Sequence, residues 1–412
     1  MLLNPFTPTE IASQPDDFFG RIIELETLER SLAKGSVVIQ GPIGIGKSSL
    51  MARARLHMEG FDSEQRAASI VLVGNKAVQT LDDAARCLVQ ELVTMDEQKN
   101  TIKFSLGKLF EIENSEAIQN YRDKHHLAVA MRILKQDYLT RVLDDERLLI
   151  IAIDEADKCP VPLAQMLRAL VTHAQQNAVR GLRFLVSGVS PFFEQMLQED
   201  NGIARFFYKS IVLEPLVLTE AHNLIAGKLR VAADDAFRRG LDLRIDPIVI
   251  DRVVAISGGH PHLLQLLGSH LIEDEDSDPD GVIDTKDLYG SLRRICYEDR
   301  SSVYNSILHE LELYNHLDSF YTLLGQSQTS PLGIIKRGFP TQINRQLAQT
   351  SIGPSELSWF VTNNILRATS PDYYGLVDEF LRVRILLDQA DSENDRELTE
   401  QGLLNGRLRL EY

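Results

Sequence analysis

Nine residues near the amino terminus, GPIGIGKSS at positions 41–49, join a glycine-rich loop to a lysine and two serines. Glycine adopts backbone conformations closed to other residues, so such a loop can follow a phosphate closely. Its N–H groups attract anions, the Lys47 ammonium can reach the β- and γ-phosphate oxygens, and the Ser48 hydroxyl can ligate Mg²⁺. The spacing predicts binding of a nucleoside triphosphate, against the alternative of a glycine-rich turn that binds nothing. The predicted phosphate-binding residues are Gly41, Pro42, Ile43, Gly44, Ile45, Gly46, Lys47, Ser48 and Ser49.

Two carboxylates follow an apolar run later in the chain. Residues 148–153 (LLIIAI) predict a fully buried parallel strand, and Asp154 and Glu155 come directly after it. Parallel sheets bind ligands at the carboxyl ends of their strands, so both side chains are expected beside the glycine-rich loop. Asp154 is the predicted metal ligand together with Ser48, and Glu155 is the predicted general base that polarises the attacking water. A surface Asp-Glu pair without a role is the alternative for this motif taken alone.

The elements that must position these residues alternate between strands and helices. A β-branched run at 37–39 predicts a strand before the loop, and an apolar-periodic segment opening at Lys47 predicts a helix after it. Further strands are predicted at 68–73 and 182–189. This alternation predicts an α/β fold with a doubly wound parallel sheet, the P-loop NTPase core. Asn75 and Lys76 lack the aspartate that completes a guanine-reading motif, which favours adenine and hence ATP.

Composition restricts the classes of protein that the chain can belong to. Its 412 residues exceed the size of one growing core, so two or three domains are expected. The net charge of −16 argues against an obligate nucleic-acid coat protein. Three cysteines stand without metal or disulfide spacing, which fits a reducing cytosol. No basic amino-terminal region and no membrane-length apolar run is present, so a soluble, cytoplasmic protein is predicted.

The segment ahead of the loop resembles the opening of AAA+ ATPases. It contains NPF at 4–6, FFGR at 18–21 and then E-x-x-x-L, as in the branch of replication initiators, transposition regulators and the related STAND signalling NTPases. The resemblance implies that Phe19, Gly20 and Arg21 lie against the adenine. It also implies that the strand after Asp154-Glu155 carries a polar sensor of the γ-phosphate, a role for which Ser187 and Ser190 compete.

Residues 203–216 resemble the last core strand of that family, which ends in x-Pro-Leu. In relatives an arginine just before this strand faces the ATP of the neighbouring subunit, and Arg205 occupies that place. The resemblance implies a homo-oligomer in which Arg205 is a catalytic residue that neutralises charge developing on the γ-phosphate. A surface arginine at a helix end is the alternative.

The remainder of the chain is predicted to be mainly helical. GGHPHLL at 258–264 resembles the lid of the same ATPases, with His260 and His262 where relatives carry an arginine sensor, so capping or packing histidines are expected. The acidic stretch EDEDSDPDG at 273–281 predicts a solvated loop. Helices followed by a hairpin near 365–377 resemble a winged helix. The predicted domains are the ATPase core at 1–216, the helical lid at 217–297, the winged helix at 298–388 and a polar tail at 389–412.

Three functions are compatible with this organisation. The first is an oligomerising ATP switch that hydrolyses ATP slowly and regulates a protein partner or effector, as in bacterial defence and signalling ATPases. The second is a DNA-transaction ATPase that binds duplex DNA through its winged helix, and the third is a nucleotide-binding scaffold with negligible turnover. The helix before the hairpin carries Glu356 and Trp359 but no lysine or arginine, so a winged helix that binds protein or acts in autoinhibition is as compatible with the sequence as one that binds DNA.

Overall fold

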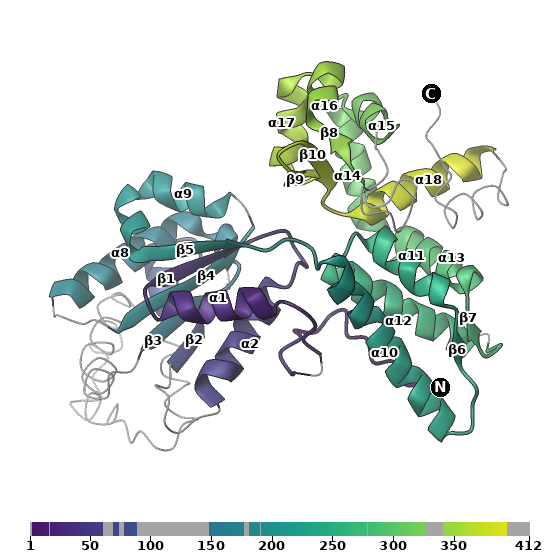
Figure 1. Ribbon diagram of the computed structural model, residues 1–412. Coiled ribbons are helices and arrows are strands. Elements are labelled where there is room, and N and C mark those ends of the chain that lie inside the picture. The colour runs from purple at the N-terminus through teal and green to yellow at the C-terminus, as the bar shows by residue number, and fades with distance from the viewer. Residues whose placement is uncertain are drawn as a thin grey trace, which may run out of the picture. The chain divides into compact units, whose positions relative to one another are not determined.

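The computed structural model describes residues 2–15, 17–60, 69–73, 78–88, 148–176, 181–189, 191–277, 279–325 and 341–393. Two compact units make up the chain (Figure 1). The first, here called the α/β unit, is Ile11–Glu214, and the second, the helical unit, comprises Met1–Glu10 with Pro215–Tyr412. Within the described ranges no helix has the length and apolar character needed to cross a membrane. The predicted four-part division of the chain stays a prediction.

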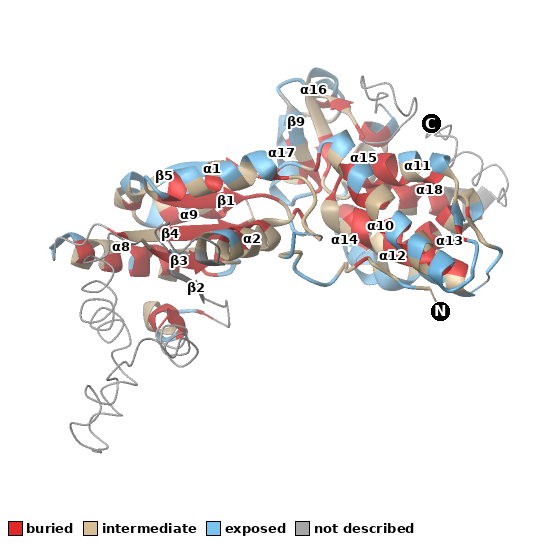
Figure 2. Cartoon of the chain, turned by 60° about the horizontal axis from the view of Figure 1, so that its bottom comes forward, coloured by how far each residue is buried: buried red, intermediate tan, exposed pale blue. Residues whose placement is uncertain are grey.

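A five-stranded, wholly parallel sheet organises the α/β unit, in the order β2-β3-β4-β1-β5. The strands are β1 (Ser36–Gln40), β2 (Ser69–Val73), β3 (Leu149–Ile153), β4 (Leu182–Gly188) and β5 (Phe207–Val212). Every residue of β1 and β3 is buried, as Figure 2 shows, because helices cover both faces of the sheet. The predicted α/β parallel sheet is therefore confirmed.

Different pairs of helices cover the two faces of the sheet (Figure 1). Helices α1 (Ile22–Leu32) and α2 (Lys47–Gly60) contribute Leu28, Leu50 and Met51 to the core on one face. Helices α8 (Pro160–Gln176) and α9 (Phe192–Glu199) fill the other face. The two faces receive alternate residues of the strands, since Val37 and Val38 belong to opposite cores.

The strand order creates a switch point between β1 and β4. From β1 the chain crosses through α2 to β2 at one edge, whereas from β4 it crosses through α9 to β5 beyond β1. Right-handed crossovers in opposite directions place their helices on opposite faces. In such sheets a ligand crevice lies at the carboxyl ends of the two strands that flank the switch point, here the paired strands β1 and β4. The glycine-rich loop leaves β1 at this crevice.

The helical unit contains α10 (Leu218–Arg238), α11 (Pro247–Ser257), α12 (Pro261–Ser277) and α13 (Thr285–Arg294), followed by a π-helical turn at Ile295–Asp299. The amino-terminal segment packs on this unit. Phe6 is buried against Gly268 of α12, where an added Cβ would lie 2.3 Å from the Phe6 ring. The buried Lys228 donates to the Pro5 carbonyl at 2.7 Å, and His262 Nδ1 lies 3.1 Å from the Pro8 carbonyl oxygen.

One prediction for this unit is wrong. The acidic stretch expected to form a solvated loop from residue 273 is helical as far as Ser277. Arg294 of α13 binds Glu273 at 2.8 Å and Asp274 at 2.7 Å, while the buried Glu275 accepts the Gly281 N–H at 2.9 Å. The helix α12 therefore continues to Ser277, because Glu273 and Asp274 pair with a cation on the next helix and Glu275 accepts a backbone N–H.

The last part of the helical unit begins with α14 (Ser301–Leu313) and α15 (Leu317–Gly325). After them come β8 (Ile343–Asn344), α16 (Arg345–Ile352), α17 (Pro354–Thr362), β9 (Leu366–Ser370), β10 (Tyr373–Leu376) and α18 (Glu379–Glu393). The strands form an antiparallel sheet in the order β8-β10-β9. The Asn344 side chain caps α16 by accepting the Leu347 N–H, and Pro354 begins α17. The predicted hairpin is present.

Candidate functional site

The glycine-rich loop turns between β1 and α2 with two glycines in the left-handed region. Gly44 has a φ of 77° and Gly46 a φ of 98°, conformations that disfavour residues with a Cβ. Ile45 between them is buried in the core beneath the loop, whereas Ile43 is exposed. The Ile45 side chain thus anchors the loop in the core. The loop backbone lies at the amino end of α2, where the helix dipole favours an anion.

Lys47, the first residue of α2, points back over the loop. Its ammonium donates to the carbonyl oxygens of Gly41 and Pro42, each at 2.8 Å. Burial lowers the pKa of Lys47 below its ordinary value, while Asp154, Asp157 and Glu155 act in the opposite direction. A cation held by weak carbonyl acceptors in a partly desolvated place binds strongly to an arriving phosphate, because the charged acceptor replaces neutral ones.

Asp154 is bound by side chains from two other segments, the start of α2 and strand β4. Its Oδ2 accepts the Ser48 hydroxyl at 2.5 Å, and its Oδ1 accepts the Glu155 N–H at 2.9 Å and the hydroxyl of Ser187. Ser48 follows β1, Asp154 follows β3, and Ser187 lies in β4 between them. The carboxylate is therefore fixed by hydrogen bonds from both neighbouring parts of the sheet edge.

The oxygen pair of Ser48 and Asp154 fits a magnesium ion. Mg²⁺ binds oxygen at 2.0–2.1 Å in octahedral geometry, so adjacent ligand oxygens lie about 2.9 Å apart. The observed 2.5 Å between Ser48 Oγ and Asp154 Oδ2 needs only a small opening to admit the ion. Across the described part of the chain, no group of three His, Cys, Asp or Glu side chains is arranged to hold a metal by protein ligands alone. Mg²⁺ suits two protein oxygens, because it retains water and phosphate ligands.

Glu155 has a left-handed backbone, with a φ of 52°, and starts the 3₁₀ turn Ala156–Lys158. Its carboxylate forms an ion pair with Lys158, and both side chains are more than half exposed. The Asp157 carboxylate accepts the Val189 N–H at 2.9 Å and so joins this turn to the end of β4. Sequence reasoning did not select Asp157 or Lys158, although three charged residues within four positions of Asp154 were a signal that could have identified them.

The structure places the predicted adenine residues on the same unit. Arg21, in the left-handed region with a φ of 60°, is buried, and its guanidinium donates to the carbonyl oxygen of Ile45 at 3.3 Å and to that of Glu214. It also binds the Glu24 carboxylate at 2.9 Å. Arg21 therefore ties the leader to the loop and to the end of the segment after β5. Phe19 is half-buried, and the adenine role of both residues stays a prediction.

Arg205 lies away from these groups. It is exposed on the 3₁₀ helix Asn201–Phe206, with its guanidinium 5.0 Å from the Phe206 ring centre, directly before β5 begins. Since β5 runs parallel to β1, Arg205 is at the amino ends of the strands. The six residues of β5 span about 20 Å, more than an arginine side chain can reach. Of the two sensor candidates, Ser187 is placed on Asp154, and Ser190 lies outside the described residues.

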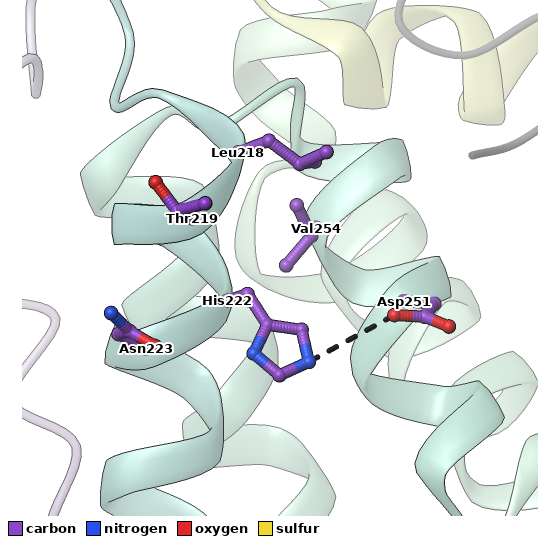
Figure 3. A pocket seen from close by; sticks show the side chains of 6 residues that line it. All are labelled: Leu218, Thr219, His222, Asn223, Asp251 and Val254. Carbon is purple, nitrogen blue, oxygen red and sulfur yellow. Dashed lines mark ion pairs between the residues drawn. The ribbon is translucent and has the colours of Figure 1, made fainter. Parts of the chain in front are cut away.

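A hollow of about 300 Å³ lies elsewhere, between α10 and α11 of the helical unit (Figure 3). Leu218 and Val254 form its apolar side, and His222 Nε2 lies 3.9 Å from Asp251 Oδ1 at the polar side. Thr219 and Asn223 complete the lining. Both ionisable side chains are about half exposed, so the hollow is an open surface feature rather than an enclosed ligand site.

Comparison with known proteins identifies the fold through structure alone. No protein-family model matches the sequence, and no curated protein matches it. A Walker-type ATPase of Pyrococcus abyssi is similar over 92% of this chain and 98% of its own, with a TM-score of 0.54 and 15% identity. The ORC2 protein of Aeropyrum pernix, solved in ADPNP–ADP complexes, is similar over 94% of this chain and 98% of its own, with a TM-score of 0.55 and 14% identity. The α/β unit thus has the fold of the P-loop NTPases. The likeness covers most of the chain and so includes much of the helical unit as well.

Proposed function

We propose that this protein is an ATP-binding switch that hydrolyses ATP slowly. The observation that carries the proposal is the convergence of Lys47, Ser48 and Asp154 at the carboxyl edge of the sheet, at its switch point. A lysine, a hydroxyl and a carboxylate there match the needs of a triphosphate and its Mg²⁺. Two structural neighbours, a Walker-type ATPase and a protein solved in ADPNP–ADP complexes, support a nucleotide at this edge.

Each residue has one role in this proposal. The loop residues at 41–49 surround the phosphates with N–H groups, and Lys47 exchanges the carbonyls of Gly41 and Pro42 for phosphate oxygens. Ser48 and Asp154 hold Mg²⁺, which neutralises phosphate charge when bound. Glu155 accepts the proton of the attacking water and leaves its ion pair with Lys158 to do so. Phe19 and Arg21 lie beside the base, and Ser187 orients Asp154.

The test separates binding from turnover. Wild-type protein with Mg²⁺ is expected to bind ATP in a calorimetric titration and to release phosphate slowly. Glu155→Gln keeps the affinity, because Ser48 and Asp154 still hold the metal, but its turnover falls about 10²- to 10⁴-fold because the amide is a poor base. Glu194→Gln, an exposed change on α9, is the matched control and keeps both activities. Parental turnover in Glu155→Gln would exclude this base, and absent ATP binding in the wild type would refute the proposal.

We further propose that the active site is shared between copies of the chain. Arg205 is too far along β5 from its own loop, and it is exposed, so a neighbouring copy is the place where its guanidinium can meet a γ-phosphate. ATP then favours self-association, because the bound triphosphate supplies the charge that Arg205 neutralises. The protein is accordingly a homo-oligomer when ATP is bound.

The helical unit acts in this proposal as the lid and the partner-binding part. Residues 217–297 form the lid, and residues 298–388 form a winged helix in which α17 precedes the β9–β10 hairpin. Residues 1–216 are assigned to the core, and residues 389–412 to a polar tail. The winged helix regulates a protein partner or effector.

Duplex DNA is the second candidate ligand of the winged helix, because this helix-and-hairpin arrangement presents a helix to a groove. The sequence of α17 carries Glu356 and no lysine or arginine, and phosphate contacts require cations. A gel-shift titration in low salt with ATP decides between the two. Binding that weakens steeply as salt increases would favour the DNA-transaction function, and no binding favours the protein partner.

A further inference from the structure

Exposed aromatic and apolar side chains gather where α14 ends and α17 passes. Leu313 and Tyr314 are 64% and 56% exposed and are adjacent in the chain. The Tyr314 ring centre lies 5.5 Å from that of Trp359 on α17, and the His316 ring lies 4.6 Å from Trp359. These side chains, with the carboxylates Glu310, Glu312 and Asp318, are called the aromatic–acidic face below.

Partly buried hydrogen bonds and one buried ring support the His316 ring of this face. His316 Nδ1 lies 2.7 Å from Glu356 Oε1, which also accepts the Ser319 hydroxyl at 2.8 Å. His316 further packs on the buried Phe360, with ring centres 5.7 Å apart. His316 is thus held by a hydrogen bond and by core packing, and the Tyr314 and Trp359 rings pack against it and each other, which lowers the ordering cost of a ligand that binds them.

The two described segments that carry the rings contain carboxylates but no lysine or arginine. Residues 301–325 and 354–366 contain no lysine or arginine, whereas Glu310, Glu312 and Asp318 are exposed carboxylates in this stretch. The two arginines of α16 and β9 are directed to the hairpin. Arg345 lies over the Tyr374 ring at 4.6 Å, and Arg367 Nε donates to the Leu376 carbonyl at 3.4 Å.

We infer that the aromatic–acidic face binds a basic, apolar segment of a protein partner. Apolar side chains of such a segment cover Leu313 and Tyr314, and its lysine or arginine side chains lie over the Tyr314 and Trp359 rings among the carboxylates. The same carboxylates repel a phosphate backbone, so the face selects protein over nucleic acid. This inference rests on the proposed function, in which residues 298–388 bind the regulated partner, and it names the chemistry of that partner.

Trp359 makes the inference directly measurable, because it is the single tryptophan of the chain. The probe is a synthetic 14-residue amphipathic helix of leucine and lysine, and its matched control has glutamate in place of every lysine. Titration of the full-length protein with the leucine–lysine peptide is expected to shift Trp359 emission to shorter wavelength and to saturate. Equal binding of the leucine–glutamate peptide, or no change with either, would overturn the inference.

Variants locate the binding on the face. Tyr314→Ala is expected to weaken the leucine–lysine peptide about tenfold, as loss of an aromatic anchor does. Tyr208→Ala in β5 is the matched control, since Tyr208 is 54% exposed, and it leaves peptide affinity unchanged. Glu310→Gln with Glu312→Gln is expected to reduce the salt dependence of binding, whereas Glu194→Gln with Glu199→Gln on α9 does not. If the two tyrosine variants weaken binding equally, the face is not the site.

The result is separable from the ATPase proposal. ATP affinity is measured in the same proteins and is expected to be unchanged by Tyr314→Ala. Peptide binding without ATP binding would refute the proposed function and leave the face supported. ATP binding with no selective peptide response would overturn the inference alone. Duplex DNA that changes Trp359 emission and competes with the peptide would also overturn it, because a phosphate ligand would then share the face.

Discussion

The edge of the α/β sheet and the aromatic–acidic face use charge in opposite ways. At the sheet edge, Lys47 lies among Asp154, Glu155 and Asp157, so cation and carboxylates compensate one another in a partly buried crevice. On the face, the segments that carry the rings, residues 301–325 and 354–366, have exposed carboxylates and no lysine or arginine. A partly buried cluster of both signs can bind a metal–phosphate group, because its lysine attracts the phosphate and its carboxylates attract the metal ion. A single-signed exposed surface instead selects its partner by complementary charge and apolar contact.

The two regions also differ in what holds their residues. Ser48 lies at the start of α2, Asp154 directly after β3 and Ser187 in β4, and both serine hydroxyls donate to Asp154 across the sheet edge. The rings of the face come from α17 and from the turn between α14 and α15, and His316 packs on the buried Phe360. Chemistry at the sheet edge should therefore be sensitive to single hydroxyls, while the face should tolerate such changes and respond to loss of large side chains.

The largest expected effect tests whether the active site at the sheet edge needs a residue from a second copy of the chain. Arg205→Ala should lower ATP turnover about 10³-fold, as removal of an arginine that stabilises transferring phosphate does. A mixture of Arg205→Ala and Glu155→Gln chains, each inactive alone, should recover activity, because mixed interfaces pair an intact arginine with an intact base. Steady-state phosphate release in the mixture, with sedimentation in ATP, measures this. Monomers with ATP and no recovery would leave Arg205 as a surface residue.

Lys47→Ala tests whether the compensated cluster serves a phosphate. A hydrogen bond to a charged group contributes about 1.5–3 kcal/mol, so ATP affinity should fall roughly 10- to 150-fold. The fold should persist, since Lys47 contacts loop carbonyls rather than the core. Calorimetric titration and thermal unfolding check the two statements. Lys34→Ala, at an exposed lysine of the same unit, serves as the control, and unchanged affinity in a folded Lys47→Ala protein would remove the phosphate site.

The buried carboxyl group of Glu379 in the helical unit should affect the stability of the fold rather than the affinity for ATP. Burial raises the pKa of Glu379 to about 7, although Thr341 donates its N–H and hydroxyl to this carboxyl and Arg382 is nearby. A raised carboxyl pKa stabilises the folded state below the unfolded pKa, and that stability is lost as pH rises through about 7.

The free energy of unfolding should accordingly fall by roughly 2–3 kcal/mol between pH 5 and pH 8 through this group. Denaturant titrations of wild type and Glu379→Gln at both pH values measure it, with the decrease smaller in the variant. ATP affinity of Glu379→Gln should equal that of the wild type at each pH. The same pH dependence in both proteins would show that Glu379 does not titrate in this range.

The smallest effect sharpens the claim about single hydroxyls. Ser187→Ala removes one hydrogen bond to Asp154 Oδ1, which still accepts the Glu155 N–H, so the loss is about 1 kcal/mol, or roughly fivefold in Mg²⁺-dependent ATP affinity. Ser48→Ala should cost more, since it removes a metal ligand. Ser257→Ala, equally buried in α11, is the control. If Ser187→Ala lowers the ATP affinity more than Ser48→Ala does, Ser187 contacts the nucleotide directly.

The sequence by itself determined the elements whose signals are local. The loop at 41–49, the apolar strand before Asp154 and the hairpin after residue 364 follow from glycine, β-branched and turn residues within a few positions, and these predictions agree with the structure. The same local logic failed for residues 273–277, because the partner that keeps them helical, Arg294, lies on another helix.

Tertiary structure alone decided how distant residues are paired. The insertion of β4 between β1 and β3 brings the Ser187 hydroxyl onto Asp154, and no spacing in the chain encodes that neighbour. Likewise, the buried Arg21 binds carbonyls at positions 45 and 214. Strand order and long-range hydrogen bonds depend on packing many segments at once, whereas a phosphate loop needs only adjacent residues of the right type, which is why the sequence alone could predict the loop and not its neighbours.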